Sequence, residues 1–329
     1  MVIDMSEADA ASPRDAVAVD VIVRFHDPDR FEELRAALLS LIGQVHRPLR
    51  VIIVTQRFSA ATHAQLDERL RPYRALDPSV TLDVVPYSRR DGLRDARAAL
   101  VNAGIAAAQG RYLAVLDYDD TLYPHAYEVL LRALRAGDAA VAFAGIALKS
   151  VAIFPSVPLG IAYARKARAP GQGLLDTLRA SFTPFHGILF DRTRIAADDL
   201  RLDESLTIEE DYDLLLRLAV RYPFSYEALW HIVGDYRYKD DGSNTVLLPG
   251  NMDAGRIALW EQAAARTEEL RRTLQVDPDI QARLGIDPPR PGLTIRNLLD
   301  QIDSGQFVPR HARLFPTQFK ANAPCNATP

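Results

Sequence analysis

The feature that most constrains the fold is an alternation of short apolar runs with longer stretches of helical spacing. The apolar runs cover 17–25, 50–55, 81–85 and 112–116, and helical spacing covers 29–43 and 93–109. Runs of this length that are rich in β-branched residues predict buried strands. Strands that alternate with helices predict a parallel sheet covered by crossover helices. We therefore expect an α/β fold for this part of the chain.

The sequence predicts a division of the chain into three segments. An acidic stretch rich in small residues predicts a flexible leader at 1–16, the α/β domain occupies 17–245, and a mainly helical extension with a loose tail occupies 246–329. Within the domain, the Pro- and Gly-containing stretch 154–173 predicts a mobile loop over the site. In the extension, the predicted docking face consists of Ile257, Leu259, Trp260 and Leu270.

Composition narrows the partners and the compartment. Lys and Arg total 39 against 43 Asp and Glu, so the net charge of −4 gives no general attraction to nucleic acid or to an anionic membrane. Cys325 is the single cysteine, which excludes an internal disulfide and favours the reducing cytoplasm. No stretch reaches the ~20 apolar residues that cross a bilayer. We expect a cytoplasmic protein without a transmembrane segment, whose contact with the inner face of the membrane would be peripheral.

An acidic cluster follows the predicted strand 112–116. Asp117, Asp119 and Asp120 place three carboxylates within four residues, and ligands collect at the carboxyl ends of parallel strands. Such carboxylates repel one another unless a cation or solvent relieves them. Hard oxygen ligands suit Mg²⁺ or Mn²⁺. The alternative is an acidic turn that caps the helix beginning near Pro124.

A second acidic cluster, 209–213, runs into an apolar helix. For Glu209 and Asp213 the favoured interpretation is that they interact with the helix dipole or cap the helix. For Asp211 a different interpretation is available, namely a role as a general base. Such a base needs a carboxylate within hydrogen-bond reach of an acceptor hydroxyl, and the start of a rigid helix can hold it there.

Together these residues resemble glycosyltransferase family 2, the inverting enzymes of GT-A fold. The stretch from Gly92 to Arg97 and the run from Asn102 to Asp120 are similar to the segment that leads into the family's Asp-x-Asp metal motif. Glu210-Asp211 resembles its Glu-Asp pair, and Tyr236-Arg237 with Ser243 resembles a later conserved segment. The resemblance covers about 17–245 and implies a mostly parallel, Rossmann-like sheet flanked by helices.

The resemblance also implies a reaction and roles for residues. A sugar would pass with inversion from a nucleotide-diphosphate donor to a hydroxyl of a glycan or lipid-linked acceptor, in polysaccharide or glycoconjugate biosynthesis. Asp119 would bind Mn²⁺ or Mg²⁺, and Asp211 would be the catalytic base. Asp117 and Asp120 would support the sugar and nucleotide. The C-terminal helices would either pack on the domain or form a homo-oligomer.

Two further donor contacts are expected, and two segments depart from the family pattern. His26 ends the first predicted strand, where the family approaches the nucleotide, and Arg97 lies one helical turn before Val101, where the family usually carries Arg. The segment Thr55-Gln-Arg-Phe58 replaces acidic residues that usually contact the base, so uridine is not assumed. Lys239 follows Tyr236-Arg237 where the family often has His.

Two alternatives remain open at this level. Asp117-Tyr-Asp-Asp-Thr121 also matches the nucleophile motif of haloacid dehalogenase-type phosphohydrolases, in which Asp117 would attack phosphorus. Against that interpretation, the nucleophile strand of those enzymes opens the domain, whereas here several strand-helix units precede it. The second alternative is a GT-A-like module that binds a glycan or nucleotide without catalysis.

Overall fold

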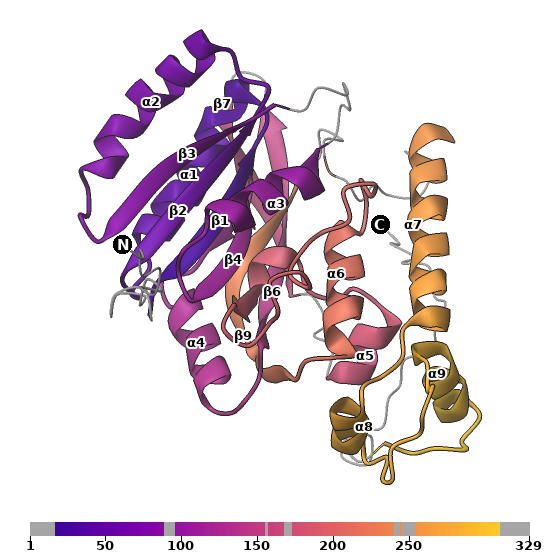
Figure 1. Cartoon of the computed structure of the whole chain (residues 1–329). Helices are drawn as coiled ribbons and strands as arrows, with labels where there is room; N and C mark the ends of the chain where they lie inside the picture. The colour runs from indigo at the N-terminus through magenta and orange to yellow at the C-terminus, as the bar shows by residue number, and fades with distance from the viewer. Residues whose placement is uncertain are drawn as a thin grey trace, which may run out of the picture.

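The structure is a computed structural model that describes residues 17–88, 96–154, 157–167, 173–239, 244 and 254–309 (Figure 1). The predicted leader 1–16 and the tail after residue 309 lie outside the described residues. The same holds for 92–95 and Ser243 of the family-like motifs.

The N-terminal half is a run of parallel strand-helix units. Its strands are β1 (Val19–Phe25), β2 (Leu49–Gln56), β3 (Val80–Tyr87) and β4 (Tyr112–Asp117), and its helices are α1 (Phe31–Ile42), α2 (Ala60–Arg74) and α3 (Arg97–Ala107). β1 pairs in parallel with both β2 and β4, and β2 pairs in parallel with β3. This half confirms the alternation predicted from the sequence.

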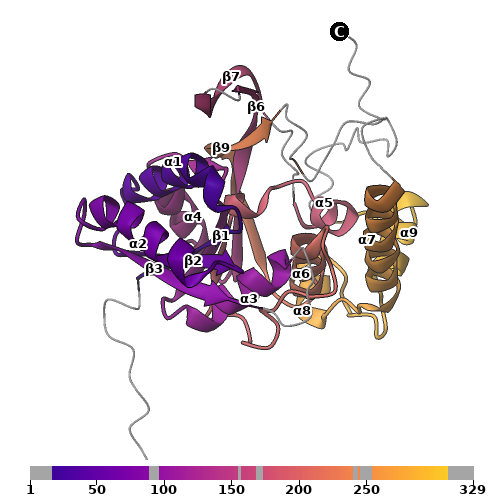
Figure 2. The ribbon, with the colours of Figure 1, turned by 90° about the horizontal axis from the view of Figure 1, so that it is seen from above.

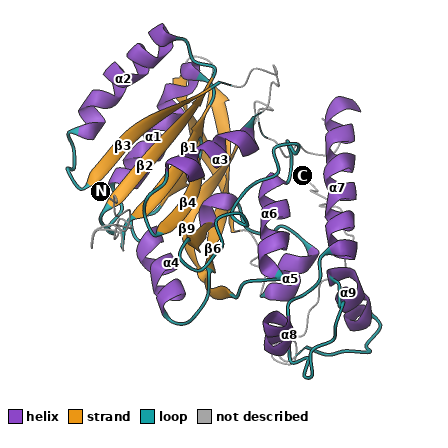
Figure 3. Cartoon of the chain, in the orientation of Figure 1, coloured by secondary structure: helices purple, strands orange, loops and turns teal. Residues whose placement is uncertain are grey.

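The second half makes the sheet mixed. It contributes β5 (Thr121–Leu122), β6 (Val141–Phe154), β7 (Val157–Ala167), β8 (Ile188–Asp191) and β9 (Phe224–Lys239). The strand order is β3-β2-β1-β4-β8-β6-β9-β5. Figure 3 shows β3, β2, β1 and β4 side by side, in orange. β8 is antiparallel to both β4 and β6, whereas β9 is parallel to β6. One sheet therefore joins the parallel half to the strands that carry the later motifs.

The predicted loop at 154–173 is largely a strand. β7 (Val157–Ala167) pairs antiparallel with the distal part of β6, from Ala147 to Phe154. Pro158 and Gly160 suggested irregular backbone, but β7 pairs with β6 alone among the described strands, and an edge strand tolerates both residue types. The prediction of a mobile loop is therefore wrong for 157–167.

The two faces of the sheet are covered by different helices (Figure 2). Val19, Val21 and Val23 belong to the core shared with α1 and α4 (Ala126–Arg135). Ile22 points to the opposite core, where α3 crosses β1. A Cβ on Gly104 of α3 would lie 2.6 Å from Ile22, so glycine is what allows this close helix-strand approach. The alternation of β1 side chains between the two cores thus determines which face of the sheet packs against α1 and α4 and which packs against α3.

The C-terminal extension adds to this second core. Its helices are α7 (Ala254–Thr273), α8 (Pro278–Leu284) and α9 (Ile295–Asp303), which join α5 (Leu174–Arg179) and α6 (Glu210–Ala219). α7 lies on the side of α6 away from the sheet (Figures 1 and 2). Leu270, Ile280 and Leu298 are buried in the same cluster as the α6 leucines. The extension therefore packs on the domain.

The predicted docking face of the extension is only partly correct. Leu270 is buried as expected, whereas Ile257 and Leu259 are 44% and 39% exposed. The buried positions of α7 are instead Ala263, Thr267 and Leu270. These three positions follow helical spacing, so this part of α7 contacts the domain. Trp260 is half-buried, and its indole Nε1 is buried.

Candidate active site

A pocket of about 380 Å³ lies at the carboxyl ends of β1, β2 and β4. It is lined by Arg24, His26, Asp27, Arg30, Gln56, Arg97, Leu100, Asp117, Tyr118, Asp119, Asp120, Tyr236, Arg237, Lys239 and Asn244. The structure thus brings together five of the six site residues expected from the sequence. The sixth, Asp211, is not in this lining.

Arg24 joins the two acidic clusters. It stands at the end of β1, where its Nε and Nη2 donate to the two carboxylate oxygens of Asp117 at 2.7 and 2.8 Å. Its Nη1 donates to Oε1 of Glu210, at the start of α6, at 2.7 Å. Burial alone would raise the pKa of Asp117, but the adjacent guanidinium outweighs it and holds that pKa below its ordinary value. Asp117 is therefore an ionised carboxylate with both oxygens engaged.

Asp120 is buried and faces away from bulk solvent. Its Oδ1 accepts the backbone N–H of Arg237 at 2.8 Å, and its Oδ2 lies 3.3 Å from Nδ1 of His186. Burial, with the nearby charges of Asp119 and Asp117, raises the pKa of Asp120 well above its ordinary value. Asp120 therefore links β9 and His186 to the acidic turn. His186 itself is 2% exposed and is therefore a packed histidine.

Asp119 is paired with a lysine from β9. Nζ of Lys239 lies 2.7 Å from Oδ2 of Asp119 and 3.8 Å from Oε2 of Glu33. The backbone of Lys239 is held by the side chain of Asn244, whose Oδ1 accepts the Lys239 N–H at 3.0 Å and whose Nδ2 donates to the Lys239 carbonyl at 2.5 Å. Sequence motifs that are 120 residues apart thereby meet at one carboxylate.

Asp211 occupies the first turn of α6, beside Glu210. Its Oδ1 accepts the backbone N–H of Tyr212 at 2.8 Å. Burial raises the pKa of Asp211 above its ordinary value, and the neighbouring Glu209 and Asp117 raise it further against the opposing effects of that hydrogen bond and Arg24. Glu209 precedes it with a left-handed backbone, φ 58°. The tight turn into α6 therefore fixes the position of Asp211 next to the residue that Arg24 binds.

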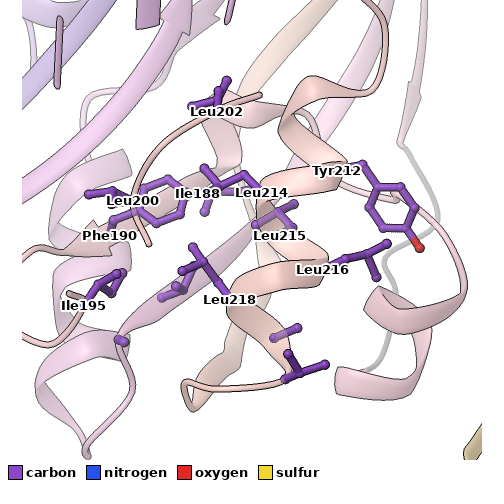
Figure 4. Packing of buried hydrophobic residues seen from close by; sticks show 14 of the residues in the cluster. Ile188, Phe190, Ile195, Leu200, Leu202, Tyr212, Leu214, Leu215, Leu216 and Leu218 are labelled. Carbon is purple, nitrogen blue, oxygen red and sulfur yellow. The ribbon is translucent and has the colours of Figure 1, made fainter. Parts of the chain in front are cut away.

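α6 is well anchored for a helix that would carry a base. Leu214, Leu215 and Leu218 pack toward Ile188 and Phe190 of β8 and the segment that holds Leu200, as Figure 4 shows. On its other side, Tyr212 receives a hydrogen bond from Arg271 of α7 at 3.1 Å. Asp213 forms ion pairs with Arg217 at 2.8 Å and Arg266 at 3.1 Å, in keeping with a structural role.

His26 and Arg97 border the pocket from two different elements, the end of β1 and the start of α3. His26 follows β1 and contacts Tyr118 edge to face, with ring centroids 5.4 Å apart. Arg97 opens α3. A smaller hollow of about 260 Å³ adjoins the pocket and is lined by His26, Pro28, Gln56, Arg57, Phe58 and Thr62. The segment that departs from the family pattern therefore lies next to the main pocket.

The carboxylates fit a metal that arrives with a diphosphate rather than one held by the protein alone. Among the described residues, no three or more His, Cys, Asp or Glu side chains are grouped to hold an ion. Asp117 is bound by Arg24, and Asp120 by Arg237 and His186. Asp119 pairs with Lys239 through Oδ2 alone, and its side chain is 26% exposed at the pocket. Mg²⁺ is often bound by one or two carboxylates together with substrate phosphates and water.

Several pocket residues were not identified from the sequence. Arg24, Arg30 and Gln56 received no role, and Lys239 was noted only as a departure from the family pattern. For Arg24 a signal existed, because an arginine inside a buried apolar strand requires carboxylate partners. For Asn244 no local signal existed, since its role depends on where β9 ends relative to Asp119.

Comparisons with known proteins agree with this geometry. A mannosyltransferase from Pyrobaculum calidifontis, PcManGT, solved with GDP-Man and Mn²⁺, has a TM-score of 0.51 at 13% identity, covering 90% of this chain and 81% of that chain. S. aureus TarS 1–349 with UDP has a TM-score of 0.52 at 14% identity, covering 90% of this chain and 77% of that one. The fold is that of the GT-A glycosyltransferases.

The sequence comparison defines the family. Residues 20–193 of this 329-residue chain match the family model for glycosyl transferase family 2. The chain belongs to this family. The succinoglycan biosynthesis protein ExoO of Rhizobium meliloti (strain 1021) is 31% identical over 187 residues, which are 54% of this chain. The chain spans about half, 49%, of the length of that relative.

The phosphohydrolase interpretation is therefore wrong. Asp117 would have to present a carboxylate oxygen to phosphorus as a nucleophile. In the structure, both of its oxygens accept hydrogen bonds from Arg24. Its strand, β4, also follows three earlier strands of the same sheet. The five-residue motif resembled the hydrolase motif by sequence alone.

Proposed function

We propose that this chain transfers a sugar, with inversion, from a nucleotide-diphosphate donor to a hydroxyl group during polysaccharide or glycoconjugate synthesis, with Mn²⁺ or Mg²⁺. The observation that carries the proposal is the joining of the two acidic clusters by Arg24, which contacts both Asp117 and Glu210. Asp211 directly follows Glu210 at the start of α6, and this adjacency supports Asp211 as the base that would act beside the donor. Structures similar in fold are described with UDP and with GDP-Man and Mn²⁺.

The donor would lie in the 380 Å³ pocket. Its base would enter the adjoining hollow near Gln56 and Phe58, and its diphosphate would lie near Asp119 and the cationic lining. His26 and Arg97 would contact the nucleotide, while Asp117 and Asp120 orient the cationic groups around the sugar. A bound divalent metal, with Asp119 as its protein ligand, would offset the negative charge on the departing diphosphate.

Asp211 would act on the acceptor. In an inverting displacement the acceptor oxygen attacks the anomeric carbon, the bond from that carbon to the diphosphate oxygen breaks, and the acceptor proton must leave. The Asp211 carboxylate would take that proton. Because burial raises its pKa, Asp211 is a stronger base than an exposed aspartate. The hydrophobic anchoring of α6 would keep this carboxylate in place.

The acceptor would be a glycan or a lipid-linked glycan. The described helices include none that is long and apolar enough to span a membrane. We infer that any contact with a membrane-bound acceptor is peripheral and occurs on the cytoplasmic side. The relative ExoO is described as a succinoglycan biosynthesis protein, and a polysaccharide acceptor for this chain follows by analogy with it.

The test is a two-part measurement on the full chain. Calorimetric titration with UDP, GDP and dTDP, each with and without Mn²⁺, identifies the nucleotide that binds. Turnover is then measured with sugar donors of that nucleotide, by release of the nucleoside diphosphate. Binding followed by turnover supports a transferase. Binding without turnover of any such donor would favour a non-catalytic module, and absence of binding would refute a nucleotide-sugar site.

A further inference from the structure

Lys239 is a buried cation in the wall of the donor pocket. Its residue is 3% exposed, yet it belongs to the pocket lining. Burying an ammonium group is costly unless carboxylates or other acceptors surround it. Asp119 at 2.7 Å and Glu33 at 3.8 Å provide two such carboxylates. Lys239 is therefore held at this point by charge, and its ammonium group lies at the pocket rather than in solvent.

The backbone around Lys239 is also fixed. Lys239 is the last residue of β9, and the side chain of Asn244 binds both its N–H and its carbonyl. Asn244 is 6% exposed. A lysine held only at its tip could leave its partner when a ligand arrives. Here the strand, the Asn244 side chain and two carboxylates together restrict the ammonium group to the neighbourhood of Asp119.

The pocket lining carries cationic side chains that an anionic ligand can contact. The lining includes five Arg or Lys side chains, against four Asp side chains. Arg24 is committed to Asp117 and Glu210. An ammonium group has three N–H donors, so Lys239 can bind Asp119 and still donate to another oxygen. The group nearest to it from a bound donor would be the diphosphate, because Asp119 is the carboxylate assigned to the diphosphate-metal end of the pocket.

We propose that Lys239 is a resident cation for the donor diphosphate, held by Asp119, so that the nucleotide binds without a divalent metal. This inference rests on the proposed function, and it names a positioning residue for the donor that the chain carries where its family often has histidine. Turnover would still draw on the metal, whose charge stabilises the departing diphosphate. Binding and turnover would then differ in their metal requirement.

Calorimetry in EDTA and in Mn²⁺ tests the proposal, with UDP, GDP and dTDP as probes. The wild-type chain should bind one of them in EDTA within about tenfold of its affinity in Mn²⁺. Lys239→Met should lose about ten- to a hundredfold in EDTA, the range of a hydrogen bond to a charged group, and clearly less in Mn²⁺. Lys239→Arg, which keeps the charge, should retain most of the metal-free binding.

Lys149→Met is the matched control. Lys149 lies on β6 and pairs with Asp235 of β9 at 2.5 Å, but it is not in the pocket lining. The Lys149→Met substitution removes a lysine-aspartate pair of the same sheet. It should leave the ratio of the nucleotide affinities in EDTA and in Mn²⁺ unchanged. Thermal unfolding of each variant verifies that it is folded at the titration temperature. If Lys239→Met fails that test, the comparison of wild type with Lys239→Arg and the wild-type affinity in EDTA decide the question.

The outcomes distinguish a failure of the Lys239 proposal from a failure of the proposed glycosyltransferase function. Tight binding of wild type in Mn²⁺ with none in EDTA would overturn the role of Lys239 and leave the transferase proposal intact. An equal loss for Lys239→Met in EDTA and in Mn²⁺ would also overturn it, because the lysine would then only shape the pocket. No binding of any nucleotide under either condition would overturn both proposals.

Discussion

The two acidic clusters of this chain look alike in sequence but differ in the partners that their carboxylates have in the structure. In the cluster at 117–120, each aspartate faces a nitrogen from another element: Asp117 meets Arg24, Asp119 meets Lys239, and Asp120 meets His186 and the Arg237 backbone. In the cluster at 209–213, Glu210 and Asp213 are ion-paired. Asp211 makes no ion pair within the described part of the chain.

Asp117 and Asp211 differ in proton affinity. The Arg24 guanidinium holds the pKa of Asp117 below its ordinary value, which keeps this carboxylate ionised. A buried carboxylate without such a cation has a higher proton affinity, which is what a general base requires. Arg24 connects the two clusters, because it contacts Asp117 on one side and Glu210 on the other.

The largest expected effect is on turnover in Asp211→Asn. The amide cannot accept the acceptor proton, so we expect kcat to fall by roughly a thousandfold, within the range of general base catalysis. Donor affinity should change little, since Asp211 is outside the lining of the donor pocket. Single-turnover kinetics with calorimetry on the same preparation measures both. Near-normal turnover in this variant would remove Asp211 from the mechanism.

The next effect is on stability in Arg24→Met. The substitution leaves Asp117 and Glu210 without their shared cation, and breaking a buried ion pair from one side costs about 3–5 kcal/mol. Urea unfolding measures the free energy of unfolding. Arg35→Met serves as its control, because Arg35 pairs with Glu32 at 2.6 Å on a partly exposed face of α1 and should cost far less. Equal losses in the two variants would argue that Arg24 is not the connection between the clusters.

A smaller effect is expected in Asp119→Asn. The amide is a weaker ligand for a hard divalent cation, so the gain in nucleotide affinity that Mn²⁺ produces, up to about tenfold, should disappear. The readout is the ratio of affinities in Mn²⁺ and EDTA. Asp27→Asn, in the lining but outside the acidic turn, should keep the wild-type ratio. Retention of the full Mn²⁺ effect in Asp119→Asn would exclude Asp119 as the metal ligand.

The smallest effect concerns the pH dependence of catalysis. Because the pKa of Asp211 is raised and the base must be ionised, kcat/KM should fall with decreasing pH at a point above the ordinary aspartate range of about 3.9. Glu209 contributes to that raised pKa by charge repulsion. Glu209→Gln should therefore move the acidic limb of the profile to lower pH. A limb that stays in place, or moves to higher pH, would show that it reports another group.

The elements at the start of the chain were predictable because their causes are local. β1 and β4 are apolar runs, and α1 has its leucines at helical spacing. The strand β7 was missed because Pro158 and Gly160 give a loop signal, and only the presence of β6 as a pairing partner overrides it. The exposure of Ile257 and Leu259 was missed for a related reason, since burial depends on what the rest of the fold places against a helix.

The sequence by itself determined the α/β class and the family, because these follow from local periodicity and from motifs within short stretches, and the same motifs contain the carboxylates of the two acidic clusters. Only the tertiary structure decided how those carboxylates are paired. Asp119 and Lys239 are separated by 120 positions, and Arg24 and Glu210 by 186. Charge interactions act through space over a few ångströms, so the state of each carboxylate depends on which distant strand end the fold brings to it.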